Sequence, residues 1–513
     1  MDRNLWLAIA LSIAVYAVWF GFVEKRVKPP APQPLAAVAA ASTGSSPTGA
    51  SATGAAATAP ASGLALRDPA EALARSEPVI LGEAEARVHP RGAALISFLY
   101  PEPLGRVELV SAPDPGLFAT WPELEFARNR AVKNGLVYAA TRGDGLSILK
   151  EYKPGEGTVL PRLSVTVLNP TRRDLEVGPW TLTVGPGLGT IDSEKKENPK
   201  VWRAVALTPE SPGLKGRIEV LKPGRHEGSF RWVGVDNRYF LAALMPSAEH
   251  FEPVATTDPP ALTLTAKPVT LKPGGSFSWE VPYYLGPKGH TWLTRYGVGL
   301  ERSIDFGFFA QLGRGMLAAL ELLHRAIGNW GWSIVVLTLA LQVLLFPLTY
   351  KSLKAAAAMK MLQPEIAKLQ KRHADDPQKL NAETMALYKT KGANPLGGCL
   401  PMLLQMPIFI ALFNALRNSW ELHGAVWMFW IRDLSAKDPY YVLPLVMGGL
   451  MFLQSKLSPP AGDPAQQQMM MFMPIVFTFM FLNFPSGLVL YWLTNSLVST
   501  VLQLTLKDRL EAA

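Results

Sequence analysis

The second half of the chain is a series of apolar stretches, each close to the length of a membrane-crossing helix. The five stretches are 330–350, 399–418, 440–456, 470–484 and 487–506. A helix needs about 20 mostly apolar residues to cross a bilayer, and Leu5–Val23 adds one more uncharged stretch near the start. The pattern predicts a polytopic α-helical membrane protein with six transmembrane helices, five of them in a core at 328–506.

Two of these stretches, 440–456 and 470–484, are short. Helices of about 15–17 residues extend roughly 22–26 Å, which is less than the ~30 Å hydrocarbon core of a bilayer. We therefore expect local membrane thinning or protein neighbours around these two helices.

The N-terminal stretch predicts a membrane anchor at 1–28, followed by a tether. A cleaved secretory signal would have a cleavage site with small residues after the apolar stretch, whereas Glu24, Lys25 and Arg26 follow here. Residues 29–63 are dominated by Pro, Ala, Ser, Thr and Gly and carry no charge. Such a composition buries too little apolar surface to order itself, so we expect a disordered linker.

Residues 64–300 have a different pattern, in which apolar and polar residues alternate in short runs separated by Pro and Gly. Period-two alternation between turn residues is typical of antiparallel strands, and regular spacing of such strands favours a sandwich. The sequence therefore predicts an inserted all-β sandwich domain at 64–300. Examples are the runs at 106–110, 162–168, 180–184 and 277–281.

Residues 301–327 predict an amphipathic helix beside the first core span. Its apolar stripe consists of Leu312, Met316, Leu320, Leu323 and Ile327, and its polar side of Gln311, Arg314, Glu321 and Arg325. Such a helix next to a membrane span is typical of an interfacial helix that lies on the bilayer. A core helix of the β-domain is the alternative.

The loop at 351–394 contains nine basic and four acidic residues, a net charge of +5 out of +9 for the chain. By the positive-inside rule it is expected to be cytoplasmic. The pattern predicts a helical hairpin whose second helix starts at Asp376-Pro377, although a solvated connector remains possible from the residues alone. Nucleic-acid binding is not expected, because Tyr388 is the only aromatic residue of the loop. The candidate site residues of this hairpin are Lys360, Lys368, Lys371 and Arg372.

Polar side chains recur inside the apolar spans, but no Asp or Glu does. Hydrocarbon penalises unpaired polar groups, so aligned polar residues indicate a site or a helix contact. Thr338, Gln342 and Thr349 share one face of the first core span. Gln405 starts the second core span, nearly opposite Asn414, unless Pro407 bends that helix. The last span presents a face made by Trp492, Asn495, Ser496, Ser499, Thr500 and Gln503. Ordinary interhelical hydrogen bonding is the alternative for each of them.

Several function classes are disfavoured by what the sequence lacks. Cys399 is the only cysteine, which rules out internal disulfides and cysteine zinc clusters. The spans contain no carboxylate pair, and the chain lacks the His-Glu-x-x-His and Gly-x-Ser-x-Gly motifs of common hydrolases. These absences disfavour an intramembrane protease, and the residues give no indication of enzyme activity, a catalytic residue, a metal site or a cofactor.

The core and the loop nevertheless contain recognisable runs. These are Phe346-Pro-Leu-Thr, Met361-Leu-Gln-Pro, Asn394-Pro-Leu-Gly-Gly-Cys-Leu-Pro, Gln405-Met-Pro-Ile-Phe, Asp433-Leu-Ser-Ala-Lys-Asp-Pro-Tyr-Tyr and Phe484-Pro-Ser-Gly-Leu-Val-Leu-Tyr-Trp. In this order they resemble the YidC/Oxa family of membrane protein insertases, and the anchor, tether and β-domain before them resemble its Gram-negative YidC layout.

The resemblance implies a membrane protein insertase and chaperone of the bacterial inner membrane. Such proteins insert and fold inner-membrane proteins through a polar groove, alone or with the Sec translocon and its accessory subunits, and without nucleotide or metal. Both termini, including the tail at 507–513, would be cytoplasmic, and 64–300 would be periplasmic. The implied partners are nascent inner-membrane proteins, the ribosome, the signal recognition machinery and membrane lipids.

One residue departs from the family pattern. Bacterial members usually have an Arg four residues after a Thr and five before the Pro of Pro-Leu-Thr, and Gln342 occupies that position here. A Gln can hydrogen-bond a substrate but cannot attract an acidic segment by charge. Hydration and hydrogen bonding are therefore expected to dominate in this groove.

A polytopic transporter or channel with a periplasmic carbohydrate-binding domain is the alternative function. A transporter would normally have ionisable residues in its spans or inverted repeats, whereas these spans contain no Asp or Glu and the sequence shows no internal repeat. The carbohydrate hypothesis depends on the tryptophans of the β-domain, Trp180, Trp202, Trp232, Trp279 and Trp292, which fit a core equally well.

Overall fold

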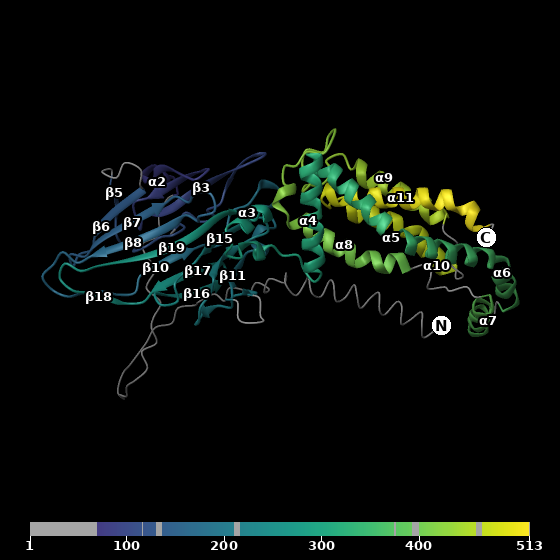
Figure 1. Cartoon of the computed structure of the whole chain (residues 1–513), viewed down its shortest axis with the longest axis horizontal. Helices are drawn as coiled ribbons and strands as arrows, with labels where there is room; N and C mark the ends of the chain where they lie inside the picture. The colour runs from purple at the N-terminus through teal and green to yellow at the C-terminus, as the bar shows by residue number, and fades with distance from the viewer. Residues whose placement is uncertain are drawn as a thin grey trace, which may run out of the picture.

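The computed structural model describes residues 69–114, 116–129, 136–209, 216–373, 376–391, 400–457 and 464–511. A β-rich half and a helical half lie end to end along the long axis of the molecule (Figure 1). The predicted anchor, the linker at 29–63 and Cys399 lie outside the described residues.

The β-rich half contains one large sheet and three smaller ones. The large sheet has nine strands in the order β12-β11-β14-β15-β19-β8-β7-β6-β5. Its strands are β5 (Ala127–Arg128), β6 (Leu136–Thr141), β7 (Ser147–Lys153), β8 (Arg162–Leu168), β11 (Arg203–Leu207), β12 (Ile218–Val220), β14 (Trp232–Asp236), β15 (Phe240–Leu244) and β19 (Ser276–Pro287).

The smaller sheets pack on the large one. One has the order β10-β17-β16-β13, another β1-β2-β3-β4, and the third pairs β18 with β9. Their strands are β1 (Glu77–Leu81), β2 (Ala84–His89), β3 (Ala94–Glu102), β4 (Gly105–Glu108), β9 (Leu175–Val177), β10 (Thr181–Val184), β13 (Gly224–Arg225), β16 (Phe251–Thr257), β17 (Pro260–Ala266) and β18 (Val269–Leu271). A short helix, α2 (Pro69–Arg75), precedes β1.

Alternating burial explains the sandwich. Along β7 and β17 the side chains alternate between buried and solvent-facing positions, and one apolar core joins residues from all four sheets. The predicted β-sandwich is therefore confirmed, although the domain is β-rich and not all-β, because it also contains short helices. Trp180, Trp232 and Trp279 are buried in this half, so three of the five tryptophans considered for carbohydrate binding are core residues.

β14 and β15 are buried on both faces, which the alternation rule does not predict. One face looks into the sandwich. The other is covered by a second core that includes Trp232, Leu241, Leu300, Leu317 and Ala415, and so extends into the helical half. The β-domain is thus packed against the helices and not merely tethered to them.

Buried charges lie at the contact between the β-domain and the helices. The Asp236 carboxylate is inaccessible to solvent and contacts Arg203 at 2.7 Å and Lys288 at 3.1 Å. Burial alone would raise the pKa of Asp236, but the two cations outweigh burial and lower it. Arg203 also reaches Asp305, whose backbone carbonyl accepts from the Asn418 amide at 2.6 Å. A line of polar contacts therefore runs from the large sheet to the end of a core helix.

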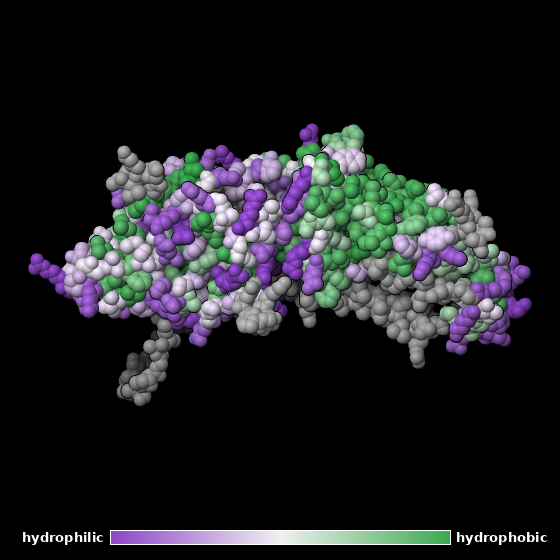
Figure 2. Space-filling view, in the orientation of Figure 1, coloured by the Kyte–Doolittle hydropathy of each residue, from purple (hydrophilic) through white to green (hydrophobic). Residues whose placement is uncertain are grey.

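The helical half contains long apolar helices, as the hydropathy pattern predicts. These helices are α4 (Ala310–Ile327), α5 (Trp330–Met361), α8 (Leu400–Asn418), α9 (Val442–Leu457), α10 (Pro464–Phe481) and α11 (Ser486–Glu511). By length and composition, Trp330–Met361 and Ser486–Leu506 could each cross a membrane, while Val442–Leu457 and Met471–Phe481 are apolar but shorter. Figure 2 shows a broad hydrophobic surface over this half, in contrast to the mixed surface of the β-rich half.

Four helices differ from their predicted bounds by five residues or more, and one of them, α11, continues to Glu511, past the predicted end at 506 and into the predicted tail at 507–513. α5 continues to Met361, eleven residues past the predicted span, because Lys351–Met361 contains strong helix formers and no Gly or Pro. α10 begins at Pro464, before the predicted 470. The predicted helix at 301–327 begins only at Ala310, after the short 3₁₀ helix η3 (Leu300–Ser303), and ends at Gly328 in a left-handed cap.

The apolar stripe of α4 faces protein. Met316 and Leu320 are buried in a core that also contains residues of α5 and α8. Glu321, which the helical wheel assigned to the polar side, is buried and contacts His290 at the start of α3 (His290–Arg295). That part of the expectation is wrong, because a partner from the β-domain satisfies the carboxylate. Leu312 and Ile327 of the stripe stay exposed.

Candidate functional site

The polar side chains of the core gather mainly between α5 and α11, two helices in extensive contact. Gln342 on α5 is largely buried, and its amide Nε2 donates to Oδ1 of Asn495 on α11. The two residues are 153 positions apart in the chain. This amide pair, Gln342 with Asn495, is the centre of the candidate groove.

Hydroxyl groups extend the polar line on both sides of the amide pair. Thr338 is buried and donates to the carbonyl of Ile334 at 2.7 Å, and Thr349 donates to Leu345 at 3.1 Å. On α11, Ser496 and Thr500 are buried, and Thr500 donates to the Ser496 carbonyl at 2.7 Å. Threonines bonded to their own helix need no substrate in order to be satisfied.

Gln405 on α8 joins the same region from a third helix. Its amide donates to the hydroxyl of Tyr491, which lies one residue before Trp492 on α11. Asn414 lies elsewhere, beside Gly307 in the segment before α4, where a Cβ would approach its Nδ2 to 2.6 Å. The two amides of α8 thus face different surroundings, as the helical wheel suggested.

The predicted face of α11 divides into two parts. Trp492 belongs to an aromatic cluster, with ring centroids 4.8 Å from Phe409, 5.3 Å from Phe481 and 6.0 Å from Phe477. It therefore faces α8 and α10, whereas Asn495 faces α5. Ser499 is half-buried, and the buried Oε1 of Gln503 has no hydrogen-bond partner among the described residues.

The helical wheel omitted two residues of this region. Tyr491 is almost fully buried and accepts from Gln405, and Thr494 is buried and donates to the Leu490 carbonyl at 2.8 Å. Tyr491 is adjacent to a chosen residue in the Leu-Tyr-Trp run, but a sequence alone does not tell which of two neighbouring aromatics meets an amide from another helix.

The basic loop forms two helices, α6 (Gln363–Arg372) and α7 (Pro377–Thr390). As predicted, α7 begins after Asp376, whose side chain caps it by accepting from Lys379 N at 3.1 Å. The hairpin has a small core of its own around Leu362 and Ile366. Lys368, Lys371 and Arg372 are exposed on α6, and Lys360 is half-buried near the end of α5.

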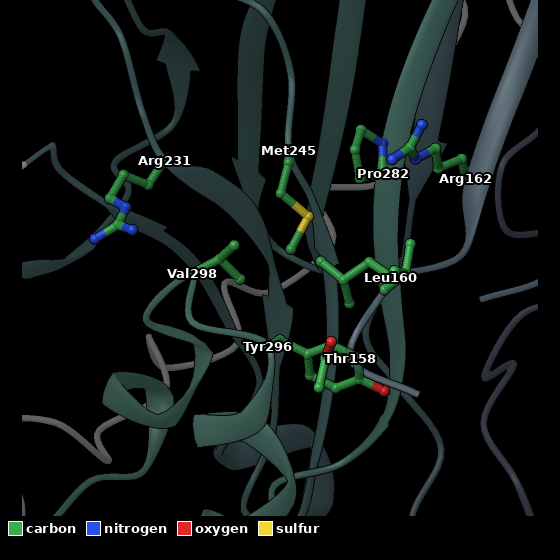
Figure 3. A pocket seen from close by; sticks show the side chains of 9 residues that line it. Thr158, Leu160, Arg162, Arg231, Met245, Pro282, Tyr296 and Val298 are labelled. Atoms are coloured by element: carbon green, nitrogen blue, oxygen red, sulfur yellow. The ribbon is translucent and has the colours of Figure 1, made fainter. Parts of the chain in front are cut away.

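A pocket lies away from the groove, in the β-rich half. It has a volume of about 380 Å³ and is lined by Thr158, Val159, Leu160, Arg162, Arg231, Met245, Pro282, Tyr296 and Val298. Figure 3 shows the two arginines at its sides and apolar side chains between them. Tyr296 is its only aromatic residue, which is a poor match for the stacking surface that the carbohydrate hypothesis requires.

The described residues contain no group of three or more His, Cys, Asp or Glu that could hold a metal ion.

Two family models match the chain. The model described as 60Kd inner membrane protein matches residues 322–513, and the model described as YidC periplasmic domain matches residues 215–319. The membrane protein insertase YidC of Endomicrobium trichonymphae is 38% identical over 432 residues, which cover 80% of this chain and 81% of that protein. The chain belongs to the YidC family of membrane protein insertases.

Another relative and a solved structure are also YidC insertases. The membrane protein insertase YidC of Nitratidesulfovibrio vulgaris is 44% identical over 337 residues, 63% of each chain. A crystal structure of an active YidC insertase, with its first transmembrane domain resolved, aligns at 18% identity and a TM-score of 0.40, covering 85% of this chain and 93% of that one.

Family membership indicates the cellular location and the substrates of this protein. This YidC-family protein is a multi-pass insertase of the inner membrane with a β-rich periplasmic domain, and its substrates are nascent membrane proteins.

Proposed function

We propose that this insertase receives the hydrophilic part of a nascent inner-membrane protein in an uncharged polar groove lined by α5, α8 and α11. The observation that supports this most strongly is the amide pair, Gln342 with Asn495, because it places a buried Gln and a half-buried Asn in hydrogen-bond contact between two largely apolar helices. No Asp, Glu, Lys or Arg lies within 330–350, 400–416 or 486–506. Charge therefore has no direct part in substrate capture at this depth.

The resting amide pair suggests how a substrate enters. Gln342 and Asn495 satisfy one another, so opening the groove costs their mutual hydrogen bond unless a substrate replaces it. A peptide segment has both donors and acceptors and can bond both amides at once. An apolar segment cannot, and it is expected to pass into the lipid instead.

The short helices beside the groove would reduce the remaining barrier. α9 has 16 residues, which extend about 24 Å at ~1.5 Å per residue and leave part of a ~30 Å core unspanned. A bilayer thinned around α9 shortens the path that a hydrophilic segment has to cross. Transfer of the substrate's own apolar span into lipid then drives completion.

The topology and the partners follow the family expectation. We propose six transmembrane helices with both termini in the cytoplasm, so that 64–300 are periplasmic and the hairpin is cytoplasmic. Lys368, Lys371 and Arg372 would then offer a basic surface to the ribosome or the signal recognition machinery. Work beside the Sec translocon belongs to the same proposal.

The decisive experiment replaces the amide pair and measures insertion. In cells depleted of the native protein, Gln342→Leu and Asn495→Leu should each reduce insertion of a small two-span membrane protein several-fold by protease mapping, and photo-crosslinks from position 342 to the substrate should be lost when Asn495 is Leu. Gln342→Arg should favour substrates with acidic segments.

Val343→Leu is the matched control, because Val343 is the next residue on α5 but is 75% exposed on its outer side. It should insert substrate normally. If no substitution at 342 or 495 alters insertion or crosslinking, the groove lies elsewhere. If depletion itself leaves insertion unchanged, the insertase role of this chain is contradicted.

A further inference from the structure

The segment between α8 and α9, residues 419–441, carries exposed aromatic side chains that neither the groove nor the β-domain uses. Phe429 is 74% exposed and Tyr440 is 67% exposed, with Val426 and Trp332 also exposed nearby. In Figure 1 this segment projects from the end of the helices that faces the β-rich half. A surface of this kind on a water-facing loop would be unfavourable.

The segment is rigid, so the exposure is not that of a loose loop. Asn329 donates to the carbonyls of Val426 at 3.2 Å and Trp427 at 3.1 Å, and Trp427 N donates to the Ile431 carbonyl at 3.1 Å. Trp430 Nε1 donates to the buried Asp438 at 2.9 Å. The turn is therefore held from both ends.

Phe429 itself has a left-handed backbone, with φ of 53°. Such a conformation is unfavourable for a bulky residue other than glycine and persists where the surroundings enforce it. The ring of Phe429 stacks on Trp430 at 5.9 Å, and Trp430 in turn contacts Tyr440 at 6.2 Å. The left-handed backbone at Phe429 therefore goes together with an outward-facing ring that stacks on Trp430.

The same surface continues into an exposed apolar face of α5. Trp332 lies in the first turn of α5 and contacts Trp427, with ring centroids 5.9 Å apart. Val336, Leu339 and Val343 are exposed on the same side of the helix as Trp332, at intervals of three or four residues. The aromatic surface is therefore the end of an apolar stripe.

Exposed basic side chains lie beside this aromatic surface. Arg432 and Lys437 are exposed in the same segment, and the Lys437 ammonium lies 5.7 Å from the Tyr441 ring. Trp and Tyr concentrate where hydrocarbon meets lipid headgroups, and basic side chains there meet phosphates. Aromatic rings between an apolar stripe and basic residues match a bilayer interface in composition and in order.

We propose that residues 426–440, with Trp332, form a wedge that inserts into the periplasmic leaflet at the headgroup boundary, with Phe429 at its tip. The wedge fixes the height of the insertase core in the bilayer from the side opposite the hairpin. Its occupant is lipid, not a nascent chain or a partner protein.

The test uses the full chain in liposomes of phosphatidylethanolamine and phosphatidylglycerol, with Cys399→Ser and a single cysteine introduced at Phe429 or Tyr440. A nitrobenzoxadiazole label at either site should show blue-shifted emission and quenching by lipids carrying a nitroxide near the headgroup. Val343→Cys should be quenched best by a nitroxide deep in the acyl chain. Val220→Cys, exposed on the β-domain, should be quenched only by aqueous iodide.

The wedge is overturned if labels at 429 and 440 behave like the label at 220. It is also overturned if they become shielded only when a nascent chain or the Sec translocon is added, since the surface would then be a protein contact. Thermal unfolding midpoints within about 2 °C of the Cys399→Ser parent confirm that each labelled variant is folded. The two label sites guard against local misfolding at Phe429, and neither lies in the groove.

Discussion

The two halves of this insertase bury polar groups in opposite ways. In the periplasmic domain, the Asp236 carboxylate is buried between two cations, Arg203 and Lys288, beside an apolar core. Where α5 meets α11 in the helical half, the buried polar groups are neutral amides and hydroxyls, while large apolar side chains such as Val343 point outward. Water outside the first half and lipid outside the second explain the inversion.

The contrast has a functional meaning. Charged partners in the periplasmic domain hold one arrangement, because breaking a buried ion pair is costly. Neutral amides in the groove can exchange partners at the cost of about one hydrogen bond. The ion-paired cluster around Asp236 therefore keeps one arrangement, whereas the groove between α5 and α11 can open.

The largest expected effect comes from removing a buried charge in the periplasmic domain. Asp236→Ala leaves Arg203 and Lys288 without their shared carboxylate, and should destabilise this domain by about 3–5 kcal/mol. Thermal unfolding with near-ultraviolet circular dichroism and limited proteolysis of the full chain would measure it. Asp192→Ala is the control, since Asp192 is 93% exposed in its pair with Lys195 and should change little. Equal effects at both sites would contradict the contrast between matched buried charges and solvated ones.

A smaller effect is expected from a steric change between two short membrane helices. A Cβ at Gly448 of α9 would lie 2.0 Å from Oγ1 of Thr478 on α10, so Gly448→Val should cost about 1–3 kcal/mol. Nothing lies within 4 Å of the Cβ position at Gly449, which makes Gly449→Val the matched control. Thermal denaturation in detergent should separate the two variants, and indistinguishable midpoints would show that α9 and α10 do not pack closely.

The contact between the halves should depend on pH. The hydrogen bond that His290 donates to Glu321 raises the pKa of His290. Burial would raise the pKa of Glu321, but the His290 contact outweighs burial and lowers it. The raised His290 pKa stabilises the folded state below about pH 6.5, and this contribution is lost as pH rises through the folded-state pKa. The Glu321 contribution is lost as pH falls below about 4.5 and through its lowered pKa.

His290→Gln should therefore lower stability by about 1.5 kcal/mol at pH 6 and by much less at pH 9. Thermal unfolding at the two pH values gives this difference. His226→Gln is the control, because it changes a half-buried histidine whose Nε2 contacts the Lys222 carbonyl in its own loop, and it should give the same stability difference at both pH values. A pH-independent difference for His290→Gln would mean that its role is packing.

The smallest effect should come from the back-bonded hydroxyls. Thr338→Val removes a hydrogen bond to the carbonyl of Ile334 in the same helix and keeps the side-chain shape, so stability should change by less than about 1 kcal/mol and insertion should be unaffected. Insertion of the same substrate should be measured quantitatively for Thr338→Val and Gln342→Leu side by side. A Thr338→Val defect as large as that of Gln342→Leu would place Thr338 in contact with substrate.

Much of this protein could be predicted from residue pattern alone. Apolar stretches predicted the long helices, because their backbone polar groups are satisfied within each helix whatever its neighbours. Alternation predicted the β-domain, and Asp376-Pro377 predicted the start of α7, because a cap is a local interaction. The polar stripe on α5 also followed from helical geometry, and so did the division of Gln405 from Asn414.

Tertiary structure decided how those faces meet. That Gln342 contacts Asn495, 153 residues away, and that Trp492 faces Phe409 instead, depends on how α5, α8 and α11 rotate and pack. The same holds for Glu321, a polar-face residue by its helical position that is buried because His290 comes from the β-domain to meet it. Local interactions determine where helices and strands form, whereas side-chain partners far apart in the chain are determined only when the packed elements bring them together.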